Sequence, residues 1–235
     1  MKKLFTISML AFTASAFDDG FYVGVNGLFQ NNKVENKVSF RGGGNQPVLD
    51  LGALNLSRQN INPNIVLGYL YSIDRWVLST YAEYTYLNDK KSKTLINRDP
   101  ALLLNRSLKL THKIRPSYGI TMKCGYKIND KNILSAVLGY VKEDHLIKTD
   151  VTYTGPPISI SKLSTKIKPN VIKVGMAYDY AFSQNIFGNV EMSYGFKDKN
   201  KKIIRQEIPI QAGISTSNVK IKRSWQIKVG VSYKF

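Results

Sequence analysis

The fold is decided by the stretch SWQIKVGVSYKF, residues 224–235, in which apolar and polar side chains alternate without a break. The odd positions from Trp225 to Phe235 are apolar or aromatic, whereas the even positions include Lys228 and Lys234. An alternation with a period of two places one set of side chains on each face of a β-strand. The segment is therefore predicted to form a strand with an apolar face and a polar face.

Seven further segments alternate in the same way, so we expect eight strands in all. Tight turns with the sequences SIDR, KINDKN and AFSQN join the second strand to the third, the fourth to the fifth and the sixth to the seventh. The other links are long, are expected to be loops, and span about 31–61, 88–112, 142–168 and 198–222. The expected strands cover about 20–30, 62–73, 76–87, 113–128, 134–141, 170–182, 186–197 and 225–235.

This succession of short and long connections is typical of outer-membrane β-barrels, which have short periplasmic turns and long extracellular loops. The aliphatic and aromatic faces would then contact lipid, and Gly, Ser, Asn and charged side chains would fill the lumen. A soluble sandwich is the alternative, but its core has no need of aromatic side chains near both ends of the strands. We predict a single all-β domain, an eight-stranded antiparallel up-and-down transmembrane β-barrel.

The N-terminus carries the features of an export signal. The basic MKK precedes the apolar stretch LFTISMLAFT, which is shorter than the roughly 20 residues of a membrane-spanning helix. The following ASA fits a cleavage site, so we expect residues 1–16 to be a cleaved signal peptide and residues 17–235 to be the outer-membrane domain. The single cysteine, Cys124, excludes an intramolecular disulfide, and two histidines with one cysteine do not suggest a metal or cofactor site.

Eight strands leave an interior that side chains can fill. The predicted inward face carries both acids and bases, and charges removed from water must be paired. We therefore predict a lumen closed by ion pairs; the alternative is a gated pore in which the same pairs switch. The predicted network comprises Glu83, Arg115, Lys123, Glu143, Lys173, Asp179, Glu191 and Lys228.

The formal net charge of the chain is +18, and Lys and Arg outnumber Asp and Glu in each of the four long links. Such a field attracts polyanions, so lipopolysaccharide, sulfated host glycans and acidic host proteins are candidate partners. The links lack the interleaved aromatic residues that stack nucleic-acid bases, and we expect no nucleic-acid partner. An AT-rich genome, or neutralisation of lipid phosphates, would produce the same lysines without a specific ligand. The candidate residues for an anionic ligand are Lys90, Lys91, Lys93, Lys199, Lys201, Lys202 and Arg205.

The last strand, with aromatic residues at alternate positions and Phe235 at its end, resembles that of small eight-stranded outer-membrane barrels of Gram-negative bacteria. The stretch GFYVGVNG, residues 20–27, fits the same group, which includes the membrane domain of outer membrane protein A and the porin-family surface antigens. The resemblance implies a location in the outer membrane and an assembly signal, Tyr233 and Phe235, that is read by the barrel assembly machinery. Because a closed barrel has no free edge, we expect a monomer.

These observations predict a surface structural or interaction protein, an adhesin or surface antigen, rather than an enzyme. A narrow porin that passes small solutes is the competing function. Some small barrels modify lipid A with a serine and a histidine near the outer rim, and His112, His145, Ser107 and Ser117 lie near the expected loop ends. No sequence signature specific to such hydrolases accompanies them, so catalysis is not expected.

Overall fold

The structure, a computed structural model, describes residues 17–41, 48–87, 89–99, 104–154, 159–198, 201–208, 213–222 and 224–235. The expected signal peptide, residues 1–16, lies outside the described residues. Within the described ranges no helix has the length and apolar character needed to cross a membrane. Their regular structure is a set of twelve strands: β1 (Gly20–Arg41), β2 (Val48–Ile73), β3 (Trp76–Thr85), β4 (Asp89–Asp99), β5 (Leu104–Asn129), β6 (Asn132–Thr154), β7 (Ser159–Ile167), β8 (Asn170–Ala181), β9 (Ile186–Lys197), β10 (Lys201–Ile208), β11 (Gly213–Ile221) and β12 (Ser224–Lys234).

Eight of these strands form a closed antiparallel ring, in the order β1-β12-β9-β8-β6-β5-β3-β2, with β2 pairing back to β1. Three short connections, at 74–75, 130–131 and 182–185, lie at one end of this ring. Closure satisfies the backbone hydrogen bonds of every ring strand and leaves none of them as an edge. The ring consists of residues 20–31 of β1, 61–73 of β2, 117–129 of β5 and 132–142 of β6, together with β3, β8, β9 and β12.

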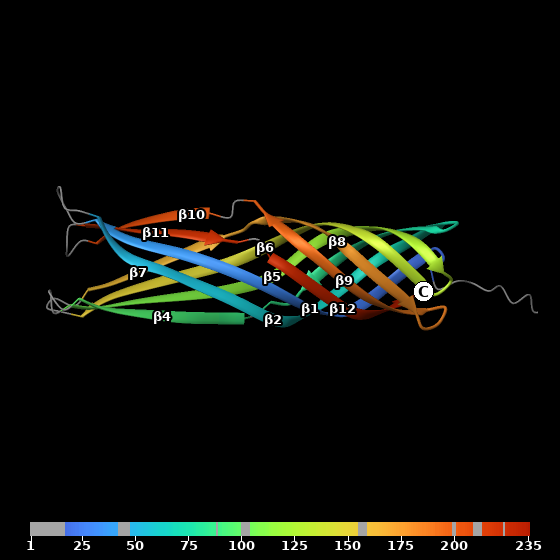
Figure 1. The fold of residues 1–235 in the computed structure, drawn as a ribbon, viewed down its shortest axis with the longest axis horizontal. Coiled ribbons are helices and arrows are strands. Elements are labelled where there is room, and N and C mark those ends of the chain that lie inside the picture. Colours follow the sequence, from blue (N-terminus) through green and yellow to red (C-terminus); the bar gives the residue numbers. More distant parts are fainter. Residues whose placement is uncertain are drawn as a thin grey trace, which may run out of the picture.

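Beyond the ring the chain continues as two four-stranded sheets, which together we call the extension. One sheet has the order β2-β1-β11-β10, and the other has the order β4-β5-β6-β7. Figure 1 shows β4, β7, β10 and β11 at one end of a long body, with the C-terminus at the other end. Residues of both sheets form one buried apolar cluster, so the sheets face each other across it. This cluster comprises Val34, Val38, Leu54, Leu56, Leu108, Leu110, Ile147, Val151, Leu163, Ile167, Val219 and Ile221.

The polarity of the inner and outer faces reverses between ring and extension, and β5 runs through both parts. In the ring, Met122 points outward and is 57% exposed, whereas Thr121 and Lys123 point inward and are buried. In the extension, Leu110 points inward and is fully buried, whereas Lys109 is exposed. The ring therefore has an apolar outside and a polar centre, and the extension has the arrangement of an ordinary water-soluble sandwich.

The prediction of four long loops was wrong over most of the described residues, because these links are largely strands of the extension. The link between the first two predicted strands, for example, continues β1 to Arg41 and begins β2 at Val48. The physical reason is the apolar cluster: alternate residues of the links, such as Val34 and Val38, are buried against the facing sheet. The eight predicted strand segments themselves correspond to the eight ring strands.

The interior of the ring is narrow enough that side chains occupy the space above glycines. The ring of Tyr22 on β1 lies over Gly68 on the neighbouring β2, and a Cβ added at Gly68 would come within 2.5 Å of it. Likewise, a Cβ at Gly230 would lie 2.1 Å from the side-chain oxygen of Asn26 on the neighbouring β1. Small inward residues on the ring strands thus make room for long polar and aromatic side chains from other strands.

Candidate functional site

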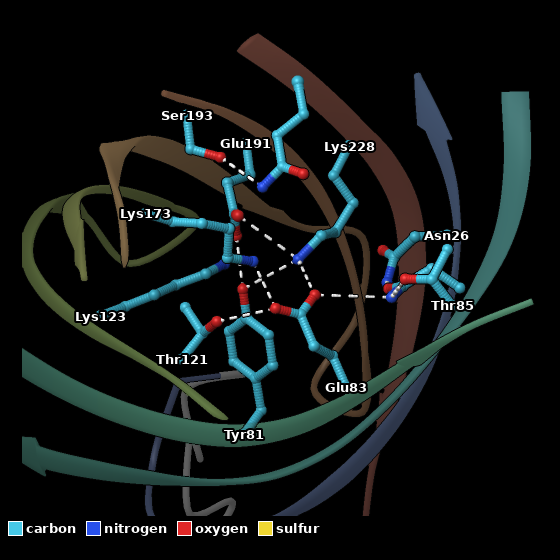
Figure 2. Close-up of polar contacts among 12 residues, drawn as sticks. Asn26, Tyr81, Glu83, Thr85, Thr121, Lys123, Lys173, Glu191, Ser193 and Lys228 are labelled. Carbon is cyan, nitrogen blue, oxygen red and sulfur yellow. Dashed lines mark hydrogen bonds and ion pairs between the residues drawn. The ribbon is translucent and has the colours of Figure 1, made fainter. Parts of the chain in front are cut away.

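The centre of the ring interior is occupied by the carboxylate of Glu83, which two lysines reach from the far side of the ring (Figure 2). Lys228 on β12 donates a hydrogen bond of 2.9 Å to Glu83 Oε2, and Lys173 on β8 pairs with Oε1. Thr121 on β5 donates a further hydrogen bond of 3.0 Å to Oε1. All four side chains are buried. The inward alternation of four separate strands brings these groups to one point.

A second carboxylate, Glu191 on β9, is joined to the same centre. Its Oε1 lies 3.3 Å from Lys228 Nζ, and its Oε2 accepts a hydrogen bond of 2.5 Å from the hydroxyl of Tyr81. Lys228 also donates to the Tyr81 hydroxyl at 3.0 Å. Lys228 therefore contacts two acids and one tyrosine. A short distance away, Lys123 and Asp179 form a separate buried ion pair of 3.1 Å.

The space toward the short turns is filled by an apolar layer rather than by a channel. Its members come from the segment before β1 and from several ring strands. Two small cavities border the charged centre, one of about 20 Å³ and one of about 10 Å³. A water molecule needs about 10–15 Å³ of such volume, so each cavity has room for about one. The apolar layer comprises Phe17, Tyr22, Val66, Leu70, Val77, Tyr81, Ile133, Ala181 and Phe187.

A second polar cluster lies where the ring meets the extension and is centred on Glu143. Lys197 Nζ donates a 2.7 Å hydrogen bond to Glu143 Oε2, and Gln30 donates one of 2.9 Å to Oε1. His145 Nε2 lies 2.7 Å from the same Oε2. The His145 ring in turn lies nearly parallel to that of His112, with Nδ1 of His145 2.9 Å from Nε2 of His112. Both histidines are fully buried.

The hydrogen bonds fix the tautomers of the two histidines. A carboxylate only accepts, so Nε2 of His145 carries a proton and donates it to Glu143. In a neutral imidazole the other nitrogen is an acceptor, so Nδ1 of His145 accepts from the N–H of His112. A second proton on His145 would place two donors opposite each other unless His112 shifted its own proton from Nε2 to Nδ1. Burial lowers the pKa of His145 below its ordinary value of 6.5, although the Glu143 carboxylate opposes this shift.

We predict that the protein loses stability as the pH falls below about 6.5. The unfolded chain takes up a proton on His145 near pH 6.5, whereas the folded chain takes it up only at lower pH, so acid favours unfolding between the two values. The urea midpoint should fall between pH 7 and pH 5. In His145→Gln, whose amide can still donate to Glu143 but does not titrate, this dependence should be much weaker. If both proteins lose stability equally between pH 7 and pH 5, titrating groups other than His145 cause the loss.

Seven of the eight residues predicted for the network point into the interior and are buried; the exception is Arg115. Its side chain is 41% exposed and lies 3.8 Å from Asp144 on the outer face. A β-bulge between Arg115 and Tyr118 shifts the register of β5. The alternation that holds for the ring part of β5 therefore assigned Arg115 to the wrong face. Tyr81, Lys197 and His145 were not predicted for this network, although all three occupy inward positions of the alternation.

The predicted loop lysines are only partly within the described residues. Lys90, Lys91 and Lys93 lie on β4 and are exposed, and Lys91 donates a hydrogen bond of 2.8 Å to the backbone oxygen of Ser57. Lys199 lies outside the described residues, and the side chains of Lys201, Lys202 and Arg205 on β10 do as well. Of the predicted assembly signal, Tyr233 and Phe235 point outward at the turn end and their rings pack edge to face.

The outer face of the β4-β5-β6-β7 sheet carries a groove of about 590 Å³ that was not predicted from the sequence. Six basic side chains and one acid line it, because every second residue of four neighbouring strands points to this face. Among the described residues, no three His, Cys, Asp or Glu side chains gather so that they could hold a metal ion. The charged groups lining the groove are Lys90, Lys109, Lys113, Arg115, Lys148, Asp150 and Lys162.

Comparison with known proteins found similar solved structures, while no family model and no curated protein matches the chain. Ail, the attachment invasion locus protein of Yersinia pestis, is 13% identical with a TM-score of 0.40, and the match covers 92% of this chain and 99% of Ail. Neisserial surface protein A is 16% identical with a TM-score of 0.34, covering 92% and 97%. The outer membrane protein OprG from Pseudomonas aeruginosa is 12% identical with a TM-score of 0.35, covering 92% and 96%. These three structures are small outer-membrane β-barrel proteins, the group that the sequence of this chain resembles.

Proposed function

We propose that the chain is an integral outer-membrane β-barrel whose lumen is filled by side chains and whose basic extension projects from the cell surface. In this proposal it is exported through its N-terminal signal and acts as a surface structural or interaction protein, an adhesin or surface antigen. Its ligands are anionic lipids or anionic host molecules. The short turns face the periplasm, as in other barrels of this kind.

The observation that carries this proposal is the reversal of polarity between ring and extension. The outer face of the ring exposes aliphatic and aromatic side chains on all eight strands, far more than the apolar patches usual on a soluble monomer. A closed ring meets the requirement that no backbone group be left unpaired in lipid. The extension has an apolar core and a charged outer face, which is the polarity of a domain surrounded by water. The boundary between the two parts therefore marks the membrane surface.

Aromatic side chains support the same placement of the membrane. Trp76 and Tyr126 pack edge to face near the short turns, and Tyr84 and Tyr118 are exposed near the start of the extension. Aromatic girdles of this kind mark the two lipid–water interfaces of outer-membrane barrels. The ring between them is the membrane-spanning part.

The filled lumen favours a structural or binding role over the alternative of a narrow porin. We predict that the purified protein gives no steady conductance in a planar lipid bilayer, because the apolar layer and the ion pairs of Glu83 and Glu191 leave space for about two waters. A porin recorded in the same bilayers is the positive control. A steady open channel from the intact protein would contradict the filled lumen and favour the porin.

The arrangement of the histidines supports a protein without catalytic activity. His112 and His145 hydrogen-bond to each other inside the protein and have no exposed surface from which to reach a substrate. Ser117 is buried in the ring as well. A rim hydrolase needs a nucleophile and a base within hydrogen-bond reach of a substrate. The histidine cluster is better understood as a packed polar layer between the lumen and the apolar core of the extension.

A further inference from the structure

We infer that the groove on the outer face of the β4-β5-β6-β7 sheet binds the phosphorylated sugar headgroup of a glycolipid in the outer leaflet. The inference rests on the proposed function, since it takes the ring as the membrane-spanning part. It specifies a binding site and a class of anion, and neither of these follows from the net charge of the chain.

The groove is built from cross-strand rows of side chains. Nearest the ring, Arg115 on β5 pairs with Asp144 on β6. In the first row beyond this pair, Lys90 on β4 lies directly opposite Lys113 on β5, and Lys113 lies opposite Leu146 on β6. In the next row, Thr111 on β5 lies opposite Lys148 on β6. All of these side chains except that of Asp144 line the groove. Positive charges from three strands therefore converge on one concave surface.

The pair Lys90 and Lys113 points to a missing anion. Like charges directly opposite each other on neighbouring strands repel and destabilise a sheet. Neither lysine has an ion-pair partner among the described residues, and the same holds for Lys109, Lys148 and Lys162. The acid in the groove, Asp150, faces Lys109 and Lys162 in the row farthest from the ring. A bound anion would relieve the repulsion in the first row.

The opposite sheet of the extension is arranged differently, which makes the groove a distinct feature rather than a general property of the surface. On β1, Glu35 pairs with Lys222 at 2.5 Å, and Lys220 on β11 lies opposite Glu35. Lys220 also lies opposite Lys201 on β10, but it has Glu35 as its neighbour on the other side. In the row of Lys90 and Lys113, by contrast, no acid lies opposite either lysine among the described residues.

The position of the groove favours a lipid headgroup as its occupant. Its lowest members, Lys113 and Arg115, precede Tyr118, which is 59% exposed, and the outward residues below Tyr118 are apolar. The groove thus starts where the lipid-facing surface ends. From Arg115 to Lys109 is six residues, or about 20 Å along a strand, which suits a headgroup with several phosphates better than a single ion. In a Gram-negative outer leaflet that headgroup belongs to lipopolysaccharide.

The test is binding of detergent-solubilised lipopolysaccharide to the full chain. The groove variant Lys90→Gln/Lys113→Gln/Lys148→Gln removes three unpaired lysines. The matched control, Lys33→Gln/Lys37→Gln/Lys220→Gln, removes three lysines from the opposite sheet. Because each lysine at an anionic lipid surface contributes about fivefold, we expect the groove variant to bind about a hundredfold more weakly. The control should change by no more than a few-fold.

Two further measurements distinguish recognition of the headgroup phosphates from a folding defect. Lipopolysaccharide treated with phosphatase should bind wild type and groove variant about equally weakly. Without lipopolysaccharide, the groove variant should unfold at an equal or higher urea concentration than wild type, because the repulsion between Lys90 and Lys113 is gone. This result also shows that weaker binding is not a folding defect.

The inference is overturned if the control variant loses as much affinity as the groove variant, since bulk charge then accounts for binding. It is also overturned if phosphatase treatment leaves binding unchanged, or if heparin binds in a groove-dependent way while lipopolysaccharide does not. None of these results bears on whether the ring spans a membrane. That part of the proposed function fails on its own if the folded chain stays soluble without detergent.

Discussion

Replacing Glu83 by glutamine should lower the free energy of unfolding by about 3–5 kcal/mol, the cost typical of removing one partner from a buried ion pair. Glu83 is the carboxylate that Lys173 and Lys228 share, and Thr121 donates to it as well. Glutamine has nearly the same shape but no charge. The change therefore isolates the loss of the negative charge from the loss of volume.

The large effect follows from what remains after the substitution. Lys173 would be left inside the ring with no carboxylate in contact, and Lys228 would depend on Glu191 alone. A buried ammonium group without a partner costs several kcal/mol even after the surroundings relax. The measurement is urea-induced unfolding in phospholipid vesicles at constant pH, with wild type and variant compared in the same lipid.

A matched control is available in the extension. Glu35 is also a glutamate paired with a lysine, Lys222, but both side chains are partly exposed to water. The hydrogen bond from Lys222 lowers the pKa of Glu35, so the pair is formed at neutral pH and is lost as the pH falls through that lowered value. Exposed pairs contribute only about 0–1 kcal/mol, so Glu35→Gln should have little effect. Equal effects at the two positions would mean that water reaches Glu83.

The ring could be predicted from the sequence because its signal is local. Period-two alternation assigns each residue to a face without any knowledge of its neighbours in space. For that reason Lys123, Asp179 and Glu191 were assigned to the inward face, and the short turns set the antiparallel order. The partners within the network were not predictable, since Lys228 meets Glu83 across the interior and not along a strand pair.

The extension was missed for a physical reason that Val34 and Leu110 illustrate. Their strands also alternate, but with the apolar side inward, opposite to the ring. The alternation of a segment shows that it has an apolar face. It does not show whether that face contacts lipid or packs against a second sheet. Where the two parts meet on β5, the bulge after Arg115 changes the register, which misplaced that residue. The groove depends on which lysines of four strands become neighbours, so it required the strand pairing.

Placing a lysine at Leu67 should lower the free energy of unfolding in vesicles by about 2–4 kcal/mol, the cost of a lysine at the middle of a bilayer. Leu67 lies on the outer face of β2 between Val23 and Ala82 of the neighbouring strands and is 59% exposed. It is six residues from the short turn after Ile73, or about 20 Å along a tilted strand, which places it near the middle of the apolar band. The same unfolding measurement in vesicles tests this.

Ile96 on β4 gives the control that makes the comparison decisive. It is 67% exposed, slightly more than Leu67, but it belongs to the extension. If water surrounds the extension and lipid surrounds the ring, Ile96→Lys should change stability by less than about 0.5 kcal/mol, as is usual for surface substitutions. A soluble protein would tolerate lysine equally at both positions, because its exposed leucine already faces water. A difference of more than about 1.5 kcal/mol between two such similar substitutions therefore requires that the ring lie in the membrane, and its absence would contradict that placement.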